Sequence, residues 1–336
     1  MLRIACSLLV AYSGGSLLSA SPGDSEAVFR TDVSLVRIDA QVVDGSNRVI
    51  PDLRVDDFVL REDGHIQPIR QFASEGVPLD VLLLLDVSAS MGPHVQRIAQ
   101  ASRQALTVLD QSDRMGIMVF DRFTRLRLPL SDSRQDWRGE IDRLLWEERF
   151  NGGTDITRAM LAAAGYMQRE GRRDARRAII ILTDDQTELD RNEGAVSTAL
   201  AAANTVMCAL IAPDALRFGR YPPGVGLRRG ILGKPVGGPG GYGGTDTQSA
   251  GTAEIAHSSG GEAIPVEQAS SLQETLQRLR QRFTLFFNLP EGVKPGEERA
   301  IEVALSDALL SRFPGATVHY RRVYMTPNND VGREVP

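Results

Sequence analysis

Leu79-Asp80-Val81-Leu82-Leu83-Leu84-Leu85-Asp86 is the stretch that decides the fold class of this 336-residue chain. A continuous apolar run of this kind is typical of a central parallel strand that is buried on both faces. A helical pattern follows, in which one face carries Val95, Ile98, Ser102, Ala105 and Leu109. A buried strand followed directly by an amphipathic helix is the repeating unit of α/β proteins.

The alternation of strands and helices continues to residue 283. Further strands are predicted at 115–120, 125–130, 178–182, 205–211 and 263–265, and the second of these is expected at the edge of the sheet. Helices with one apolar stripe are predicted at 137–145, 156–167, 194–203 and 272–283. We therefore expect residues 79–283 to form a doubly wound, mostly parallel sheet with helices on both faces. Within this region, residues 213–251 are rich in glycine and proline and are expected to form a flexible loop.

Two β segments flank the α/β region. Residues 28–76 contain alternating apolar positions and the turn dipeptides Asp44-Gly45 and Asp63-Gly64. Residues 284–325 follow with strands predicted at 283–289, 299–305 and 318–325. Because either segment alone is small for a stable core, we expect the two to form one all-β domain into which the α/β domain is inserted. The polar tail, residues 326–336, is expected to be disordered.

The first 20 residues predict export. Arg3 precedes an apolar run, and small residues around Ala20 offer a cleavage site, which together indicate a signal peptide. The alternative is a buried N-terminal helix, although the run has no helical amphipathicity. No later segment has 18 consecutive apolar residues, so no membrane span is expected and the mature chain is expected to be extracytoplasmic, periplasmic or secreted.

The net charge of −5 argues against nucleic acid as a partner, because that function needs a concentrated basic surface. A basic cluster does precede the strand at 178–182, and it consists of Arg172, Arg173, Arg176 and Arg177. It lies at the opposite end of the sheet from the site described next, and we interpret it as a solvated helix end. Cys208 lies in an apolar run and is expected to be a buried, inert thiol.

Oxygen-bearing side chains gather where the predicted strands end. Asp86, Ser88 and Ser90 follow the first strand, Thr154 lies in a Gly-Gly-Thr-Asp loop that opens a helix, and Asp184 follows the strand at 178–182. In open α/β sheets, ligands bind at the carboxyl ends of the strands. Hydroxyl and carboxylate oxygens are hard ligands that suit Mg²⁺, Mn²⁺ or Ca²⁺ and not Zn²⁺. The alternative is that the serines cap a helix and that Asp184 is a turn residue.

These three elements, in this order, resemble the metal-ion-dependent adhesion site (MIDAS) of von Willebrand factor type A (VWFA) domains, whose Rossmann-like fold is a doubly wound sheet. The resemblance covers about residues 79–283. It implies that Ser88, Ser90 and Thr154 bind the ion directly, while Asp86 and Asp184 hold coordinating waters or bind at longer range. It also implies that a Glu or Asp side chain of a protein partner completes the coordination of the ion.

The flank before the α/β domain extends the resemblance. The segment 56–64, with Gln67 and Phe72, is similar to the segment that precedes such domains in the bacterial VWFA-related acidobacterial proteins. One departure concerns Asp185, which stands where the family often has glycine. Asp tolerates the left-handed backbone that such a position needs. Its added carboxylate is expected either to raise metal affinity or to repel an acidic ligand.

Three further residues lie near the expected site. Glu188 and Asp190 extend its acidic rim, and we interpret them as part of a solvated loop. His94 lies near the 86–90 loop and is the one histidine worth testing as an acid or base, although a solvated first-turn residue is its expected role.

We expect a secreted, metal-dependent, adhesion-type protein-binding module that is not an enzyme. The chain has no G-x-x-x-x-G-K-[ST] loop, no G-x-S-x-G elbow and no histidine pair at metal spacing. The alternatives are a structural scaffold with a degenerate metal site and a metal-dependent hydrolase.

Overall fold

The computed structural model of the chain describes residues 35–92, 94–95, 105–148, 150, 152–212, 247–266 and 270–327. The predicted signal peptide (1–20), most of the predicted loop at 213–251 and nearly all of the predicted tail at 326–336 lie outside these residues. Most of the helix predicted after residue 92 lies outside them as well.

A six-stranded sheet forms the centre of the α/β domain. Its strand order is β12-β10-β8-β5-β6-β7, and every neighbouring pair is parallel except β6 and β7. The strands are β5 (Leu79–Asp86), β6 (Arg114–Phe120), β7 (Thr124–Ser131), β8 (Arg176–Thr183), β10 (Thr205–Ile211) and β12 (Ala263–Pro265). The predicted doubly wound, mostly parallel sheet is confirmed, and β7 is the edge strand.

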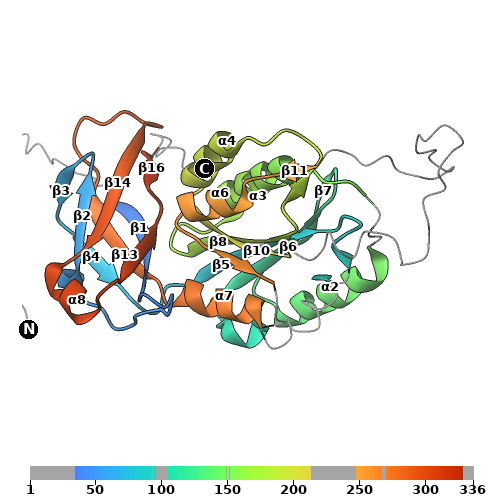
Figure 1. The fold of residues 1–336 in the computed structure, drawn as a ribbon, viewed down its shortest axis with the longest axis horizontal. Helices are drawn as coiled ribbons and strands as arrows, with labels where there is room; N and C mark the ends of the chain where they lie inside the picture. The colour runs from blue at the N-terminus through green and yellow to red at the C-terminus, as the bar shows by residue number, and fades with distance from the viewer. Residues whose placement is uncertain are drawn as a thin grey trace, which may run out of the picture. The chain divides into compact units, whose positions relative to one another are not determined.

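Helices cover both faces of this sheet (Figure 1). One face packs against α2 (Arg134–Glu147), α7 (Ser271–Arg280) and the short η2 (Leu106–Val108); the other packs against α3 (Ile156–Glu170), α4 (Glu193–Ala202) and α6 (Thr252–Ser258). Along β5, Leu83 and Leu85 point to the first face, while Leu82 and Leu84 point to the second. Because both faces of β5 are buried, its sequence is continuously apolar.

The two flanks form a second, all-β unit. It has one sheet of order β15-β1-β13-β4 and another of order β16-β14-β2-β3. The N-terminal flank contributes, in chain order, β1 (Leu35–Val43), the short helix η1 (Val55–Asp57), β2 (Phe58–Glu62), β3 (His65–Gln67) and β4 (Gln71–Ala73). Strands β13 (Phe283–Asn288), β14 (Glu298–Leu305), β15 (Thr317–Tyr320) and β16 (Val323–Met325) come from the C-terminal flank. Each sheet pairs strands of both flanks, as predicted, because β13 lies beside β1 and β14 lies beside β2.

In the C-terminal flank, one helix was not predicted and one predicted strand is wrong. A helix, α8 (Asp307–Arg312), follows β14, and the single strand predicted at 318–325 is two strands that belong to different sheets. The chain changes sheets at Arg321, whose side chain is buried. Its guanidinium donates to Asn204 in the α/β domain and to the carbonyl of Arg37 in β1. Because the buried Arg321 side chain binds these acceptors, the predicted strand is interrupted at Arg321 and forms two strands, β15 and β16.

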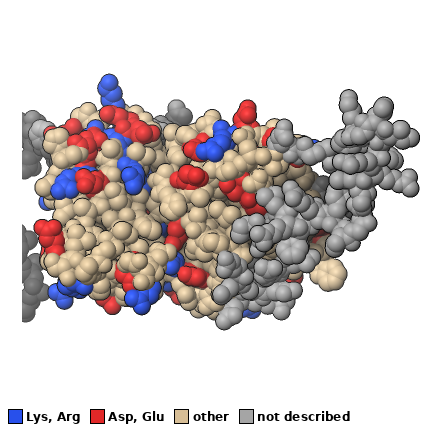
Figure 2. Space-filling view, in the orientation of Figure 1, with Lys and Arg blue, Asp and Glu red and all other residues tan. Residues whose placement is uncertain are grey.

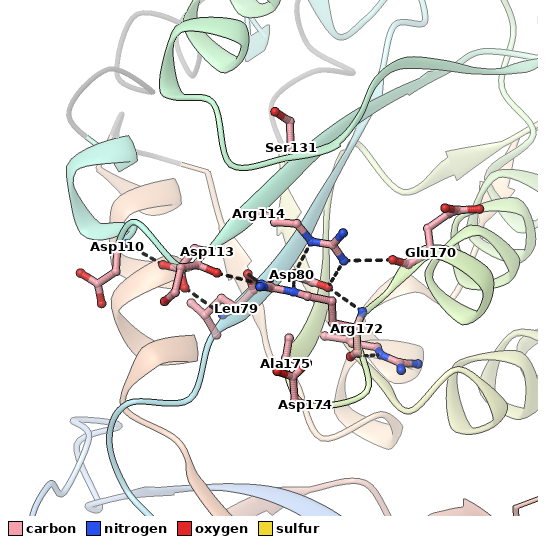
Figure 3. A network of polar contacts seen from close by, with 12 residues as sticks. Leu79, Asp80, Asp110, Asp113, Arg114, Ser131, Glu170, Arg172, Asp174 and Ala175 are labelled. Atoms are coloured by element: carbon pink, nitrogen blue, oxygen red, sulfur yellow. Dashed lines mark hydrogen bonds and ion pairs between the residues drawn. The ribbon is translucent and has the colours of Figure 1, made fainter.

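The interpretation of the basic cluster as a solvated helix end is wrong for Arg172, Arg176 and Arg177, while Arg173 is exposed as expected. Arg172 donates to Asp80 with an Nη2–Oδ1 distance of 2.7 Å, and Arg114 donates to the same carboxylate at 2.6 Å (Figure 3). Asp80 is fully buried at the amino end of β5. Burial raises its pKa, but the hydrogen bonds from Arg114 and Arg172 outweigh burial and hold the pKa below its ordinary value. Arg114 and Arg172 thus neutralise the buried Asp80 carboxylate within the otherwise apolar strand β5.

Arg176, from the same cluster, joins the two domains. It is only 1% exposed. Its guanidinium donates to Asp39 of β1 at 3.3 Å, to the Thr284 hydroxyl of β13 at 3.0 Å and to the carbonyls of Leu279, Arg280 and Arg282. Asp39 also accepts from Arg37 at 3.2 Å. The start of β8 is therefore anchored in the β domain.

We predict that Asp39→Asn destabilises the protein by about 3 kcal/mol at pH 6, because it leaves Arg37 and Arg176 buried without their carboxylate. Burial alone would raise the pKa of Asp39, but Arg37 and Arg176 hold it well below its ordinary value. The ionised carboxylate therefore stabilises the fold above pH of about 4, and this contribution is lost as the pH falls further. Urea unfolding at pH 6, 4 and 3 checks this.

The difference between wild type and Asp39→Asn is expected to shrink as the pH falls below 4. Asp190→Asn, on an exposed stretch, is the matched control and should leave stability unchanged. A difference that stays constant over this pH range would show that Asp39 acts by packing and not by charge.

Candidate metal centre

Asp86 ends β5 and is fully buried. One carboxylate oxygen accepts from the Ser88 amide at 2.9 Å, and the other accepts from the Thr183 hydroxyl at 2.8 Å. The first bond stabilises the turn that follows β5, and the second links the end of β5 to the end of β8. Thr183 was not among the predicted site residues, and only its place directly before Asp184 signalled it.

Ser88, Ser90 and Asp184 form a chain of close oxygens. The Ser90 hydroxyl donates to Oδ2 of Asp184 at 2.6 Å, and the two serine Oγ atoms lie 3.4 Å apart. The second Asp184 oxygen accepts from the Gln186 amide at 3.0 Å and fixes the loop after β8. Neighbouring oxygens around an octahedral Mg²⁺ lie about 3 Å apart, because each Mg–O bond is about 2.1 Å. The spacing and the hard-oxygen chemistry of this set therefore fit a small divalent cation.

The loop that carries Thr154 lies alongside the serine loop. Gly152 forms a parallel bridge with Ser88, and its carbonyl accepts from the Ala89 amide at 3.4 Å. Thr154 is buried, and its carbonyl accepts from the Glu188 amide at 3.0 Å. Asp155 caps α3 through a bond from the Arg158 amide at 3.0 Å. Of the five predicted residues, four are thus joined in one network, and Thr154 lies in the adjacent loop.

The electrostatics of this edge differ from those of the amino end of the sheet. Burial raises the pKa of Asp86 to about 7; the nearby Asp184 carboxylate adds to the shift, and the hydrogen bonds from Ser88 and Thr183 oppose it. No basic side chain is among these causes. Among the described residues, no three His, Cys, Asp or Glu side chains gather in a metal-binding group. A cation at this edge would therefore depend on hydroxyl oxygens as well as on the two carboxylates.

Comparison with known families identifies the domain. The family model of the von Willebrand factor type A domain matches residues 81–187, which include β6, β8, most of β5 and all five predicted site residues. The chain contains a von Willebrand factor type A domain. No curated protein sequence matches the chain.

Solved structures to which the chain is similar share little sequence with it. An aerotolerance-related membrane protein from Bacteroides fragilis is 20% identical, with 61% of this chain and 98% of that chain covered and a TM-score of 0.45. BatB from Bacteroides thetaiotaomicron is 18% identical, with 61% and 97% covered and a TM-score of 0.45. Proximal thread matrix protein 1 from the mussel byssus, with a zinc-occupied MIDAS motif, is 13% identical, with 65% and 49% covered and a TM-score of 0.42.

Asp185, the residue by which this VWFA domain departs from the family pattern, serves a different helix. Its backbone is left-handed, with φ of 61°, a conformation that Asp tolerates. Its carboxylate accepts from the Ser249 hydroxyl at 2.6 Å and from the Thr252 amide at 3.0 Å. Oδ1 thus caps the first residue of α6, at the positive helix end, while Oδ2 binds Ser249 in the short strand β11 (Gln248–Ser249). The carboxylate is thus engaged at α6, and its expected roles as an added ligand or as a repelling charge stay predictions.

Two interpretations of nearby residues are wrong. His94 is buried in the VWFA domain and is not a solvated first-turn residue. Glu188 is largely buried and pairs with Arg122, whose Nη2 lies 2.8 Å from its carboxylate. The Glu188 carboxylate lies over Gly153, so a side chain at that position would require the Glu188 carboxylate to move. Asp190, in contrast, is exposed as expected.

We predict that Asp86→Asn stabilises the ion-free protein at pH 8 by a few kcal/mol, because an ionised Asp86 is buried without a cationic partner. A folded-state pKa raised to about 7 means that wild type loses stability as the pH rises from about 4 to 7. The variant does not titrate there. Its advantage should therefore grow over that range and stay constant above it.

Urea unfolding in EDTA between pH 4 and pH 8 measures this advantage. Asp39→Asn is a control for which the opposite effect is expected. The Asp39 carboxylate is neutralised by arginines, so its loss should destabilise the protein. Equal unfolding free energies of Asp86→Asn and wild type at every pH would contradict the electrostatic description of this edge.

Proposed function

We propose that the chain is an exported, divalent-cation-dependent protein-binding module. The observation that carries this proposal is the chain of oxygens from Ser88 through Ser90 to Asp184 at the carboxyl edge of the sheet. In this proposal Ser88, Ser90 and Thr154 hold the ion directly, and Asp86 and Asp184 hold its waters or bind at longer range. A bound ion would supply an electrophilic centre with a position for a carboxylate.

The donor set suits capture of an acidic group. Hydroxyl ligands are neutral, so they leave most of the charge of a divalent ion uncompensated. Asp86 is held by Ser88 and Thr183, and Asp184 by Ser90 and Gln186, so both carboxylates are orientated before any ion arrives. Oxygen ligands of this kind favour Mg²⁺, Mn²⁺ or Ca²⁺. A Glu or Asp side chain of a protein partner is the matching ligand.

The partner we propose is a protein and not a nucleic acid. Figure 2 shows blue and red side chains interspersed over the described surface in view, so no large single-sign area appears on that face. Nucleic-acid binding depends on a concentrated basic surface. The whole chain carries a net charge of −5.

One observation favours a second candidate, a structural scaffold that uses no ion. The polar side chains of the site satisfy one another, because Ser90 donates to Asp184 and Thr183 donates to Asp86. A buried network that is already satisfied needs no cation to be stable. Metal titration separates this candidate from the first.

Export rests on the sequence of residues 1–20, with Arg3 before an apolar run and small residues near Ala20. Among the described residues, no helix is long and apolar enough to cross a membrane. N-terminal sequencing of extracytoplasmic protein tests this part of the proposal. A protein that starts near residue 21 supports export, and an intact Met1 on cytoplasmic protein contradicts it.

We predict that one Mg²⁺ or Mn²⁺ binds per chain and raises the melting temperature, since a ligand of the folded state stabilises it by mass action. Ser90→Ala removes the oxygen between Ser88 and Asp184 and should reduce the heat of binding and the melting shift strongly. Ser249→Ala is the matched control, because that hydroxyl binds Asp185 at the same edge of the sheet. Calorimetric titration with Mg²⁺, Mn²⁺ and Ca²⁺ measures both.

Identical heats and melting shifts for wild type and Ser90→Ala would favour the scaffold. A loss in Ser249→Ala equal to that in Ser90→Ala would place the ion elsewhere on this edge.

A further inference from the structure

The exposed apolar side chains of the VWFA domain are not scattered. Among its described residues, the large hydrophobic side chains that are exposed are Phe123, Leu126, Trp146 and Leu189. Phe123 lies in the turn from β6 to β7 and Trp146 in the last turn of α2, while Leu189 follows the short strand β9 (Gln186–Thr187). They are 65%, 90% and 53% exposed. Single exposed hydrophobic residues are ordinary, but a group of them on one side of a domain marks an interaction surface.

The topology puts these three side chains at the edge that carries Asp86 and Asp184. Strand β6 ends at that edge and β7 starts there, so the Phe123 turn belongs to it. Helix α2 follows β7 and runs in the opposite direction, so it ends at the same edge. Gly152, a few residues after α2, forms a bridge with Ser88. Leu189 follows Asp184 in the chain. We call Phe123, Trp146 and Leu189 the apolar rim.

Ion pairs hold the segments of the apolar rim together. Arg122, beside Phe123, pairs with Glu188, beside Leu189, at 2.8 Å. Arg125, in β7, pairs with Glu148, two residues after Trp146, at 3.2 Å. The Asp121 carbonyl accepts from the Asp155 amide at 3.0 Å, which ties the turn to the Thr154 loop. The rim therefore consists of segments that contact one another around the metal centre.

The charges around the apolar rim are compatible with the approach of an acidic side chain of a partner. Each carboxylate named above has an arginine partner: Glu188 has Arg122, Glu148 has Arg125, and Asp121 has Arg125 at 2.9 Å. Arg122 is more than half exposed, so its guanidinium keeps a side open to solvent. An approaching carboxylate thus meets these three neutralised acids and the exposed Arg122 guanidinium, although Asp190 beside Leu189 is an exposed acid and the whole chain is acidic.

We propose that the apolar rim makes this site selective for protein segments in which an Asp or Glu side chain lies next to a large apolar residue. The inference rests on the proposed function, since the ion takes the carboxylate while the rim covers the neighbouring apolar side chain. The rim side chains are already exposed and lie on segments held by ion pairs, so little ordering opposes binding. Each apolar contact that is lost should weaken binding by about tenfold, the size of effect usual for anchoring residues at an interface.

The test starts from a displayed library of random peptides of about twelve residues, selected on the full chain in Mg²⁺ and eluted at low pH, so that binders are recovered whether or not they need the ion. The expected consensus has Asp or Glu within a residue or two of Trp, Phe, Leu or Ile. The best peptide, and a version with that apolar residue changed to alanine, are then titrated by fluorescence polarisation against four proteins. These are wild type, Ser90→Ala, a rim variant (Phe123→Ser, Trp146→Ser, Leu189→Ser) and a control variant (Leu35→Ser, Ile66→Ser, Leu310→Ser).

The control variant removes exposed hydrophobic residues of the β domain. We expect it to bind like wild type, and we expect the rim variant to bind the best peptide at least tenfold more weakly. The alanine peptide should lose little further affinity for the rim variant, because the two changes remove the same contact. The rim variant should keep the calorimetric Mg²⁺ affinity of wild type, which shows that it is folded with its metal centre intact.

Two failures are distinguishable. Peptide binding that needs Mg²⁺ and Ser90 but is equal in wild type and the rim variant overturns the selectivity of the rim and leaves the proposed function standing. Peptide binding that survives EDTA and Ser90→Ala overturns the proposed function, and this inference with it. A consensus with an acid and no apolar neighbour also overturns the role of the rim.

Discussion

The buried Arg176 guanidinium is the contact on which the placement of the two domains depends. Burying a cation is costly unless all its donors find partners, and Arg176 finds Asp39, Thr284 and three carbonyls at the end of α7 and the start of β13. These acceptors come from segments far apart in the chain. Together they hold the start of β8. The same strand ends at Thr183, so the anchor at one end of β8 positions the residues next to Asp184 at the other.

The two ends of β5 carry buried carboxylates in different electrostatic environments. Asp80 at the amino end is paired with Arg114 and Arg172, and its pKa is lowered despite burial. Asp86 at the carboxyl end is buried beside Asp184, and its pKa is raised to about 7. The first arrangement is stable on its own. The second leaves a carboxylate for which a cation is the natural partner, and perturbed carboxylates of this kind concentrate at functional sites.

The sequence predicts the local features of this protein well and its long-range pairings poorly. Apolar runs such as 79–86 identify the strands, and Asp86, Ser88 and Ser90 identify the edge where a ligand would bind, because both signals lie within a few residues. Glu188 looked solvated because its partner Arg122 is 66 residues away, and Arg176 looked solvated because Asp39 is 137 residues away. Arg321 ends β15 by reaching Asn204, 117 residues away, and no local pattern contains that contact.

These long-range pairs also explain why the β domain leaves the candidate site open. Arg37 donates to the carbonyl of Ala175, just before β8, and Arg321 donates to Asn204, just before β10. Arg282, before β13, donates to the carbonyl of Gly260, just before β12. Each contact therefore involves the amino end of a parallel strand. Because the carboxyl ends of those strands lie at the opposite edge, a partner can bind over Ser88, Ser90 and Asp184 without displacing any of these domain contacts. The β domain then acts as a fixed base for the binding edge and not as a competitor for it.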